Sequence, residues 1–166
     1  GTITGGTLAI SRDTALGNAN NGVVFDGGTL QFSNGFNLAN TRALTLNAGG
    51  GTIDTNGFST TISQAIDGVG GLTKVGAGTL TLAGTNAYQG NTTINGGTLA
   101  VSSNGALGSS SGLTINNGGT LQVSSVVSFA SPVTLNGAAT FDIVDSFGAL
   151  SVSGNVGGSG SLTKTG

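Results

Sequence analysis

The sequence predicts an all-β chain folded as a parallel β-helix, a solenoid of stacked coils. The first observation is that short runs such as Thr79–Leu82 (TLTL) and Thr98–Val101 (TLAV) alternate polar and apolar residues between corners rich in glycine and asparagine. This period of two is typical of short half-buried strands. The second observation is a Gly-Thr-Leu motif that recurs with its looser variants, and its clean steps are 20 to 23 residues, the length of one coil with three strands and three corners.

The repeated motif also predicts the number of coils. Copies of Gly-Thr-Leu and its looser variants indicate about eight coils of roughly 19–23 residues, which gives a rod roughly 40 Å long at the spacing of paired strands. The copies begin at Gly6, Gly28, Gly51, Gly78, Gly97, Gly119 and Ala139.

In chain order, the first half reads as strands joined by two polar loops. Gly1–Ile10 gives two strands around a glycine corner, and Ser11–Asn21 is a loop that carries an adjacent Arg12/Asp13 charge pair. Val23–Ser33 gives two further strands. A loop at Phe36–Arg42 follows, and then strands continue to the glycine-rich corner that ends at Gly71.

The second half repeats this plan. Four strands occupy Gly71–Val101, and Ser102–Gly112 matches the earlier polar loop. Pro132 opens the next strand, a position where the missing amide donor is tolerated, and Gly154–Gly160 forms another glycine-rich corner. Matching segments lie 88 to 91 residues apart, as Thr2–Ile10 and Thr93–Val101 do. We therefore expect one solenoid domain, residues 1–166, with an incomplete module at 1–76 and a second at 77–166.

The inward positions of these strands predict the core, and the corner glycines predict where the chain turns. We expect a stack of one large apolar side chain per coil, which no single coil could bury alone. The predicted core and motif residues are Leu8, Leu30, Ile53, Leu80, Leu82, Ile94, Leu99, Val101, Leu121 and Phe141. The predicted corner residues are Gly6, Gly28, Gly97 and Gly119, because glycine tolerates the backbone angles of a sharp turn.

Composition argues against several functional classes. The chain has 33 glycines, four basic and six acidic residues, and neither histidine nor cysteine. The lack of a basic patch makes nucleic acid a poor partner. The sequence contains no run of eighteen apolar residues, so we expect no membrane-spanning segment. Without histidine or cysteine we expect no catalytic triad, thiol nucleophile or ordinary zinc site, and we predict no catalytic residue, metal or cofactor.

The stretch from Lys74 to Val101, KVGAGTLTLAGTNAYQGNTTINGGTLAV, resembles the passenger-associated β-strand repeat of bacterial autotransporters, which use type V secretion. The resemblance implies a right-handed parallel β-helix. It also implies export across the outer membrane and display at the cell surface or outside the cell. It implies no ligand and no chemistry.

Two weaker patterns point to chemistry. Asp142 and Asp145, three residues apart, are the sharpest enzymatic alternative, an acid/base pair of the kind that glycoside hydrolysis uses. Asp67–Gly71 is similar to part of a calcium-binding nonapeptide, but its acidic register does not recur. Because Asp142 repeats Asp54, we interpret it as a corner residue, and we interpret Asp67–Gly71 as a glycine-rich corner. The two lysines, Lys74 and Lys164, are expected to be exposed repeat positions.

Three non-enzymatic functions remain open. The first is a structural or adhesive segment of a surface-displayed passenger, whose partners are neighbouring coils and surface receptors. The second is an extracellular fibre subunit that stacks end to end through open β-helix edges. The third is ice or carbohydrate binding by a rank of outward threonines such as Thr7, Thr29, Thr98 and Thr120, interrupted at Ala9, Gln31, Ala100 and Gln122. The resemblance favours the first.

Overall fold

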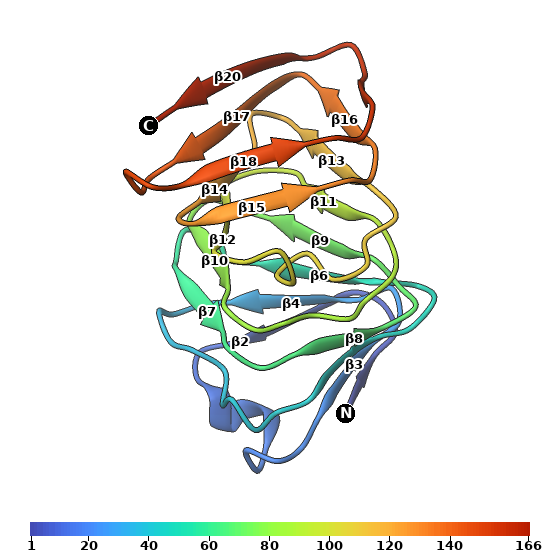
Figure 1. The fold of residues 1–166 in the computed structure, drawn as a ribbon. Helices are drawn as coiled ribbons and strands as arrows, with labels where there is room; N and C mark the ends of the chain where they lie inside the picture. Colours follow the sequence, from blue (N-terminus) through green and yellow to red (C-terminus); the bar gives the residue numbers. More distant parts are fainter.

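The computed structural model describes residues 1–166, and its regular structure is parallel β-strand with a single short 3₁₀ helix, η1 (Asp13–Leu16). The coils stack along one axis, with the N-terminus at one end and the C-terminus at the other (Figure 1). Each coil adds one strand to an eight-stranded sheet, so the solenoid has about eight turns, as the repeats predict. The all-β parallel solenoid is therefore confirmed.

Three sides of the solenoid carry the sheets. The eight-stranded sheet comprises β2 (Thr7–Ile10), β4 (Thr29–Phe32), β6 (Gly51–Asp54), β9 (Leu72–Val75), β11 (Thr92–Ile94), β13 (Leu113–Asn116), β16 (Val133–Asn136) and β19 (Val156–Gly157). The six-stranded sheet comprises β7 (Thr60–Ile62), β10 (Thr79–Leu82), β12 (Thr98–Val101), β14 (Thr120–Val123), β17 (Ala138–Ile143) and β20 (Ser161–Thr165). The third side holds a four-stranded sheet, β1 (Thr2–Ile3), β3 (Val23–Phe25), β5 (Leu44–Leu46) and β8 (Ile66–Gly68), and a two-stranded sheet, β15 (Val126–Phe129) and β18 (Ala149–Val152).

Two loops, residues 83–91 and 102–112, bridge the gap between the two sheets of the third side. The amide of Ala87 donates to the carbonyl of Ile66 in β8 at 2.8 Å, and the amide of Ser109 donates to the carbonyl of Tyr88 at 2.9 Å. The amide of Ser128 in β15 then donates to Oδ1 of Asn104 at 2.7 Å. Hydrogen bonding between coils therefore continues along this side even where no strand is formed.

Asn86 strengthens this bridge from within. Its side chain is buried; Oδ1 accepts from the amide of Ile66 at 2.8 Å, and Nδ2 donates to the carbonyl of Ala106 at 2.5 Å. An amide side chain has the same donor and acceptor as a peptide group, so Asn86 replaces the backbone hydrogen bonds that a strand would supply. Nearby, the buried Tyr88 hydroxyl pairs with the Thr92 hydroxyl at 2.8 Å.

The two loops of the first coils are held together by an ion pair between a buried arginine and a partly exposed aspartate. Arg42 is 0% exposed, and its Nη2 lies 2.8 Å from Oδ2 of Asp13. Asp13 Oδ1 also accepts from the amide of Ala39 at 2.9 Å. Asp13 therefore pairs with a buried arginine in the next coil and not with Arg12, its neighbour in sequence.

Segments that match in sequence lie one sheet apart in the structure. Thr2–Ile10 forms β1 and β2, on the four- and eight-stranded sheets, whereas Thr93–Val101 lies on the eight- and six-stranded sheets. Lys74 lies in β9 of the eight-stranded sheet, and its counterpart Lys164 lies in β20 of the six-stranded sheet. A spacing of about ninety residues thus takes the chain through four coils and one further side.

This rotation divides the predicted core stack into two. Leu30 pairs with Ile53 in the eight-stranded sheet, whereas Leu80, Leu99 and Leu121 pair in succession in the six-stranded sheet. The interpretation of all Gly-Thr-Leu copies as one stack is therefore wrong. Apart from Leu8, the predicted core residues are buried, with exposed fractions of 0 to 7%: Leu30, Ile53, Leu80, Leu82, Ile94, Leu99, Val101, Leu121 and Phe141. Leu8 is 42% exposed, because β2 is the edge strand of its sheet.

The predicted corner glycines are required for two different physical reasons. Gly97 has a φ of 62° and Gly6 a φ of 64°, the left-handed region that side chains disfavour. At Gly28 a Cβ atom would collide with Ile3, and at Gly119 it would lie 2.8 Å from Cγ2 of Ile94, so the close packing of adjacent coils excludes a side chain there.

Candidate functional surface

A continuous rank of threonines runs along the outside of the eight-stranded sheet. Its members pair with one another from coil to coil, and they point outward because their strand neighbours, such as Ile53 and Ile94, are buried. We call this set the first threonine rank: Thr7, Thr29, Thr52, Thr73, Thr93, Thr114 and Thr134.

A second threonine rank lies on the six-stranded sheet and contains Thr79, Thr98, Thr120, Thr140 and Thr163. The sequence grouped Thr7 and Thr29 with Thr98 and Thr120, but the structure places these pairs on different sides. Each rank is a single file, since the outward positions two residues further on include Ala9 and Gln31 beside the first rank and Ala100 and Gln122 beside the second.

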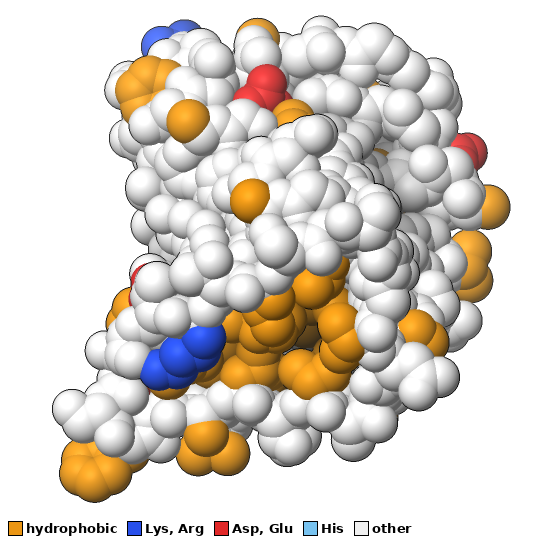
Figure 2. Space-filling view, turned by 90° about the horizontal axis from the view of Figure 1, so that it is seen from above, with side chains coloured by type: hydrophobic (Ala, Val, Ile, Leu, Met, Phe, Trp, Pro, Cys, Tyr) orange, Lys and Arg blue, Asp and Glu red, His pale blue; other side chains and the backbone are white.

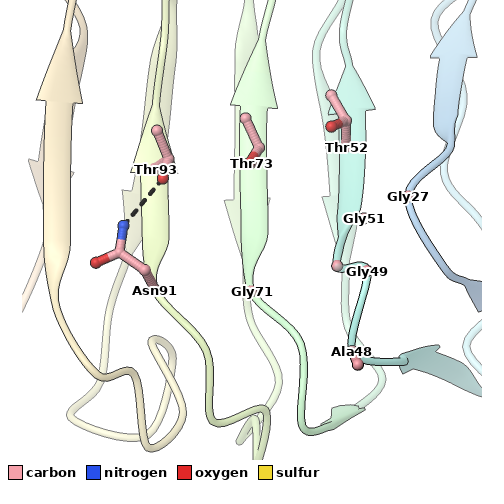
Figure 3. A pocket seen from close by; sticks show the side chains of 10 residues that line it. Gly27, Ala48, Gly49, Gly51, Thr52, Gly71, Thr73, Asn91 and Thr93 are labelled. Carbon is pink, nitrogen blue, oxygen red and sulfur yellow. Dashed lines mark hydrogen bonds between the residues drawn. The ribbon is translucent and has the colours of Figure 1, made fainter.

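A polar groove of about 290 Å³ lies beside the first rank, and we refer to it as the polar groove. Figure 3 shows Thr52, Thr73 and Thr93 side by side on neighbouring strands, with glycine-rich corners next to them. The lining residues are Gly27, Ala48, Gly49, Gly50, Gly51, Thr52, Gly71, Thr73, Asn91 and Thr93. None of these side chains is charged or aromatic.

The Asn91 amide fixes one end of the groove. Its Nδ2 donates to Oγ1 of Thr93 at 3.0 Å, to Oγ1 of Thr114 at 3.1 Å and to the carbonyl of Thr92 at 3.1 Å. Thr52 and Thr73 make no side-chain hydrogen bond within the protein. Their hydroxyls therefore face the groove as unpaired donors and acceptors.

Close packing keeps the glycine side of the groove bare. A Cβ atom on Gly49 would lie 2.7 Å from Asp26, and one on Gly71 would collide with the carbonyl oxygen of Asn91. Gly50 has a φ of 70°. Because side chains are excluded at these corners, peptide groups form the floor that a ligand would contact.

The carboxylates that the sequence singled out make structural contacts. Oδ2 of Asp142 accepts from Gln122 Nε2 at 3.0 Å and Oδ1 accepts from Thr165 Oγ1 at 2.7 Å; these hydrogen bonds lower the pKa of Asp142. Asp145 instead accepts from the amide of Phe147 at 3.0 Å, within a turn. The Gln122–Asp142 contact repeats that of Gln31 with Asp54, at 2.7 Å. Asp67 lies in β8, and the structure brings no three acidic side chains together as a metal site would require.

Lys74 is a buried cation that the sequence prediction placed on the surface, and this prediction is wrong. Its side chain is 0% exposed, and Nζ donates to the carbonyls of Val75 at 2.9 Å, Gly76 at 2.6 Å and Gly96 at 3.2 Å. Burial lowers the pKa of Lys74 to about 8, although the charge of Asp54 opposes the shift. The ammonium group thus binds two successive corners together. Lys164 is exposed and makes the same contact with the carbonyl of Gly166.

These features define a parallel β-solenoid with polar, uncharged outer ranks. Residues 72–101 match the sequence model of the passenger-associated-transport-repeat, so the repeat recognised in that stretch is confirmed. No curated protein and no solved structure matches the chain. The chain also contains no helix of the length and hydrophobicity needed to span a bilayer. The right-handed sense implied by the resemblance stays a prediction.

Proposed function

We propose that this chain is a non-enzymatic segment of an autotransporter-like passenger. In this role it acts as a rigid rod or spacer at the bacterial surface, and its sides serve as adhesive surfaces. The observation that carries the proposal is the unbroken stacking of eight coils that include a passenger-associated-transport-repeat. Each coil buries its apolar side chains against its neighbours, so stiffness extends along the whole axis.

Deletion within a displayed passenger tests the spacer role. At about 4.8 Å per coil, removing the eight coils should bring an epitope at the distal end roughly 38 Å closer to the outer membrane. Cryo-electron tomography of gold-labelled cells measures this height. An epitope height that the deletion leaves unchanged contradicts the proposal, and so does an intact passenger that stays inside the cell.

The alternative is a fibre subunit that stacks through its ends, and one observation favours it. Figure 2 shows hydrophobic side chains lining a hollow at the end of the solenoid, where Phe141, Ile143 and Leu150 surround about 310 Å³. Either a further coil of the same chain or the end of a second copy would cover this hydrophobic surface. A denatured polypeptide from the producing cells that is far larger than 15.8 kDa favours the spacer, and a 15.8 kDa chain that forms high polymer favours the fibre.

A further inference from the structure

Within the first threonine rank, some hydroxyl groups have a partner in the protein and others have none. Thr93 and Thr114 accept from Asn91, whereas Thr52 and Thr73 have no side-chain partner. All four are half-buried, so their β-branched side chains are held in restricted rotamers. Such hydroxyls offer a ligand both donors and acceptors at a low cost in conformational entropy.

The chemistry of the groove restricts the class of ligand. The lining contains hydroxyls, one amide and peptide groups, and Ala48 is its one hydrophobic residue. The nearest carboxylate is that of Asp26, whose Oδ1 accepts from the amide of Gly49 at 2.8 Å. With that negative charge at the rim and no cation in the lining, the groove disfavours anionic ligands. Neutral hydroxyl groups fit it best.

We propose that the polar groove binds a neutral carbohydrate chain that lies along the solenoid axis, with Thr52, Thr73 and Thr93 as successive contacts. The threonines are one coil apart, about 4.8 Å, which is close to the length of one pyranose unit in an extended glycan. Each sugar residue therefore meets one hydroxyl of the rank and the peptide groups of one glycine corner. This inference rests on the adhesive part of the proposed function and names its ligand class.

Because the first threonine rank repeats the same contact in each coil, we expect several low-affinity sites that bind one glycan chain together. Without an aromatic side chain for stacking, binding depends on hydrogen bonds that compete with water, so the affinity for a short oligosaccharide is weak. The rank continues beyond the groove to Thr29 on one side and to Thr114 and Thr134 on the other. A longer glycan therefore gains avidity by contacting several coils at once.

Titration of the ¹⁵N-labelled chain with neutral cello-, malto- and chito-oligosaccharides tests the proposal by amide chemical shifts. We expect at least one series to shift the amides of Gly49–Gly51, Gly71, Thr73 and Asn91, with affinity rising with oligosaccharide length. Oligogalacturonate, an anionic counterpart, should not produce these shifts. The isosteric triple variant T52V/T73V/T93V should weaken binding at least tenfold.

A matched variant in the second threonine rank, T79V/T98V/T120V, makes the same chemical change on another side and should bind like the wild type. Absence of shifts with all three neutral series, shifts confined to other surfaces, or equal losses in both triple variants would overturn the proposal. Unchanged urea midpoints show that both variants are folded. Adhesion or surface display that persists without glycan binding would leave the proposed function standing while this inference fails.

Discussion

Arg42 and Asp13 lie 29 residues apart, and Nε and Nη2 of the arginine donate to Oδ1 and Oδ2 of the carboxylate at 2.9 and 2.8 Å. Arginine Nη1 also donates to the carbonyl of Asn21 at 2.6 Å. The guanidinium therefore binds the whole first polar loop to the next coil. The contact lies on the side of the first coils where the chain forms loops, between β2 and β3 and between β4 and β5, and no strand.

Replacing Arg42 with methionine should destabilise the chain by roughly 3 kcal/mol, because it leaves the carboxylate of Asp13 and several carbonyls without their donor. Urea unfolding, followed by circular dichroism, measures the loss. Arg12→Met is the matched control, since Arg12 is exposed and makes no ion pair, and it should change the midpoint little. Equal effects of the two substitutions would contradict this role of Arg42.

The same pair predicts an acid-sensitive stability. The hydrogen bond from Arg42 lowers the pKa of Asp13 below its ordinary value of 3.8. A carboxyl with a lowered folded-state pKa contributes stability above its unfolded value and loses it as pH falls through the folded value. The stability difference between wild type and Asp13→Asn should therefore be full at pH 5 to 7 and shrink below about pH 3.8. A difference that is independent of pH contradicts the prediction.

Lys74 predicts a second pH-dependent change in stability, at alkaline pH and with the same sign. Its folded-state pKa is about 8 against an ordinary value of 10.5, so between these values the unfolded chain binds the proton more strongly. Stability should therefore rise with pH across this window relative to Lys74→Met, which cannot titrate. Comparing urea midpoints at pH 7, 8 and 9.5 checks the sign. A stability difference that falls or stays constant would show that the ammonium is not held in a disfavoured state.

Asn86→Ala should cost about 1 to 3 kcal/mol, because it leaves the amide of Ile66 and the carbonyl of Ala106 buried without partners. Hydrogen exchange of the Ile66 amide measures the local effect directly. Asn104→Ala, which removes a contact made by an exposed loop residue, is the control. Protection of Ile66 that is unchanged in Asn86→Ala contradicts the bridging role.

Leu99 and Thr98 are adjacent residues that face opposite sides of β12. Leu99 is 0% exposed, whereas Thr98 belongs to the second threonine rank. Leu99→Asp should prevent stable folding, because it buries an unpaired charge, and Thr98→Asp should lower the urea midpoint only slightly. Similar midpoints for the two variants would contradict the assigned strand orientation.

The sequence predicted strands and coil length well, because glycine corners and period-two runs are local signals. Lys74 was also accessible to this reasoning: two residues after Leu72, it shares the inward side of the same strand, yet its charge suggested an exposed position. The side of the solenoid on which each strand lies could not be predicted from the sequence. It depends on loops that take the place of strands: on the side of the six-stranded sheet before β7, and on the third side after β8.

The candidate surface was predictable only in part. Outward threonines follow from alternation, but their grouping into ranks requires the register between coils. The polar groove arises from the three-dimensional approach of corners near Gly27, Gly49 and Gly71, which are distant in sequence. The partners of Arg42 and Asn86 are likewise set by which loops come to lie side by side.

Uninterrupted stacking from β4 to β16 underlies both the rod and the threonine rank, and a distance along the rank tests it most directly. The chain has no cysteine, so nitroxide labels can be placed singly on Thr29→Cys and Thr134→Cys, five coil steps apart. Double electron–electron resonance should give one narrow distribution near 24 Å, five times the strand spacing, within the reach of the labels. A broad distribution, or a mean far from this value, would contradict a continuous solenoid.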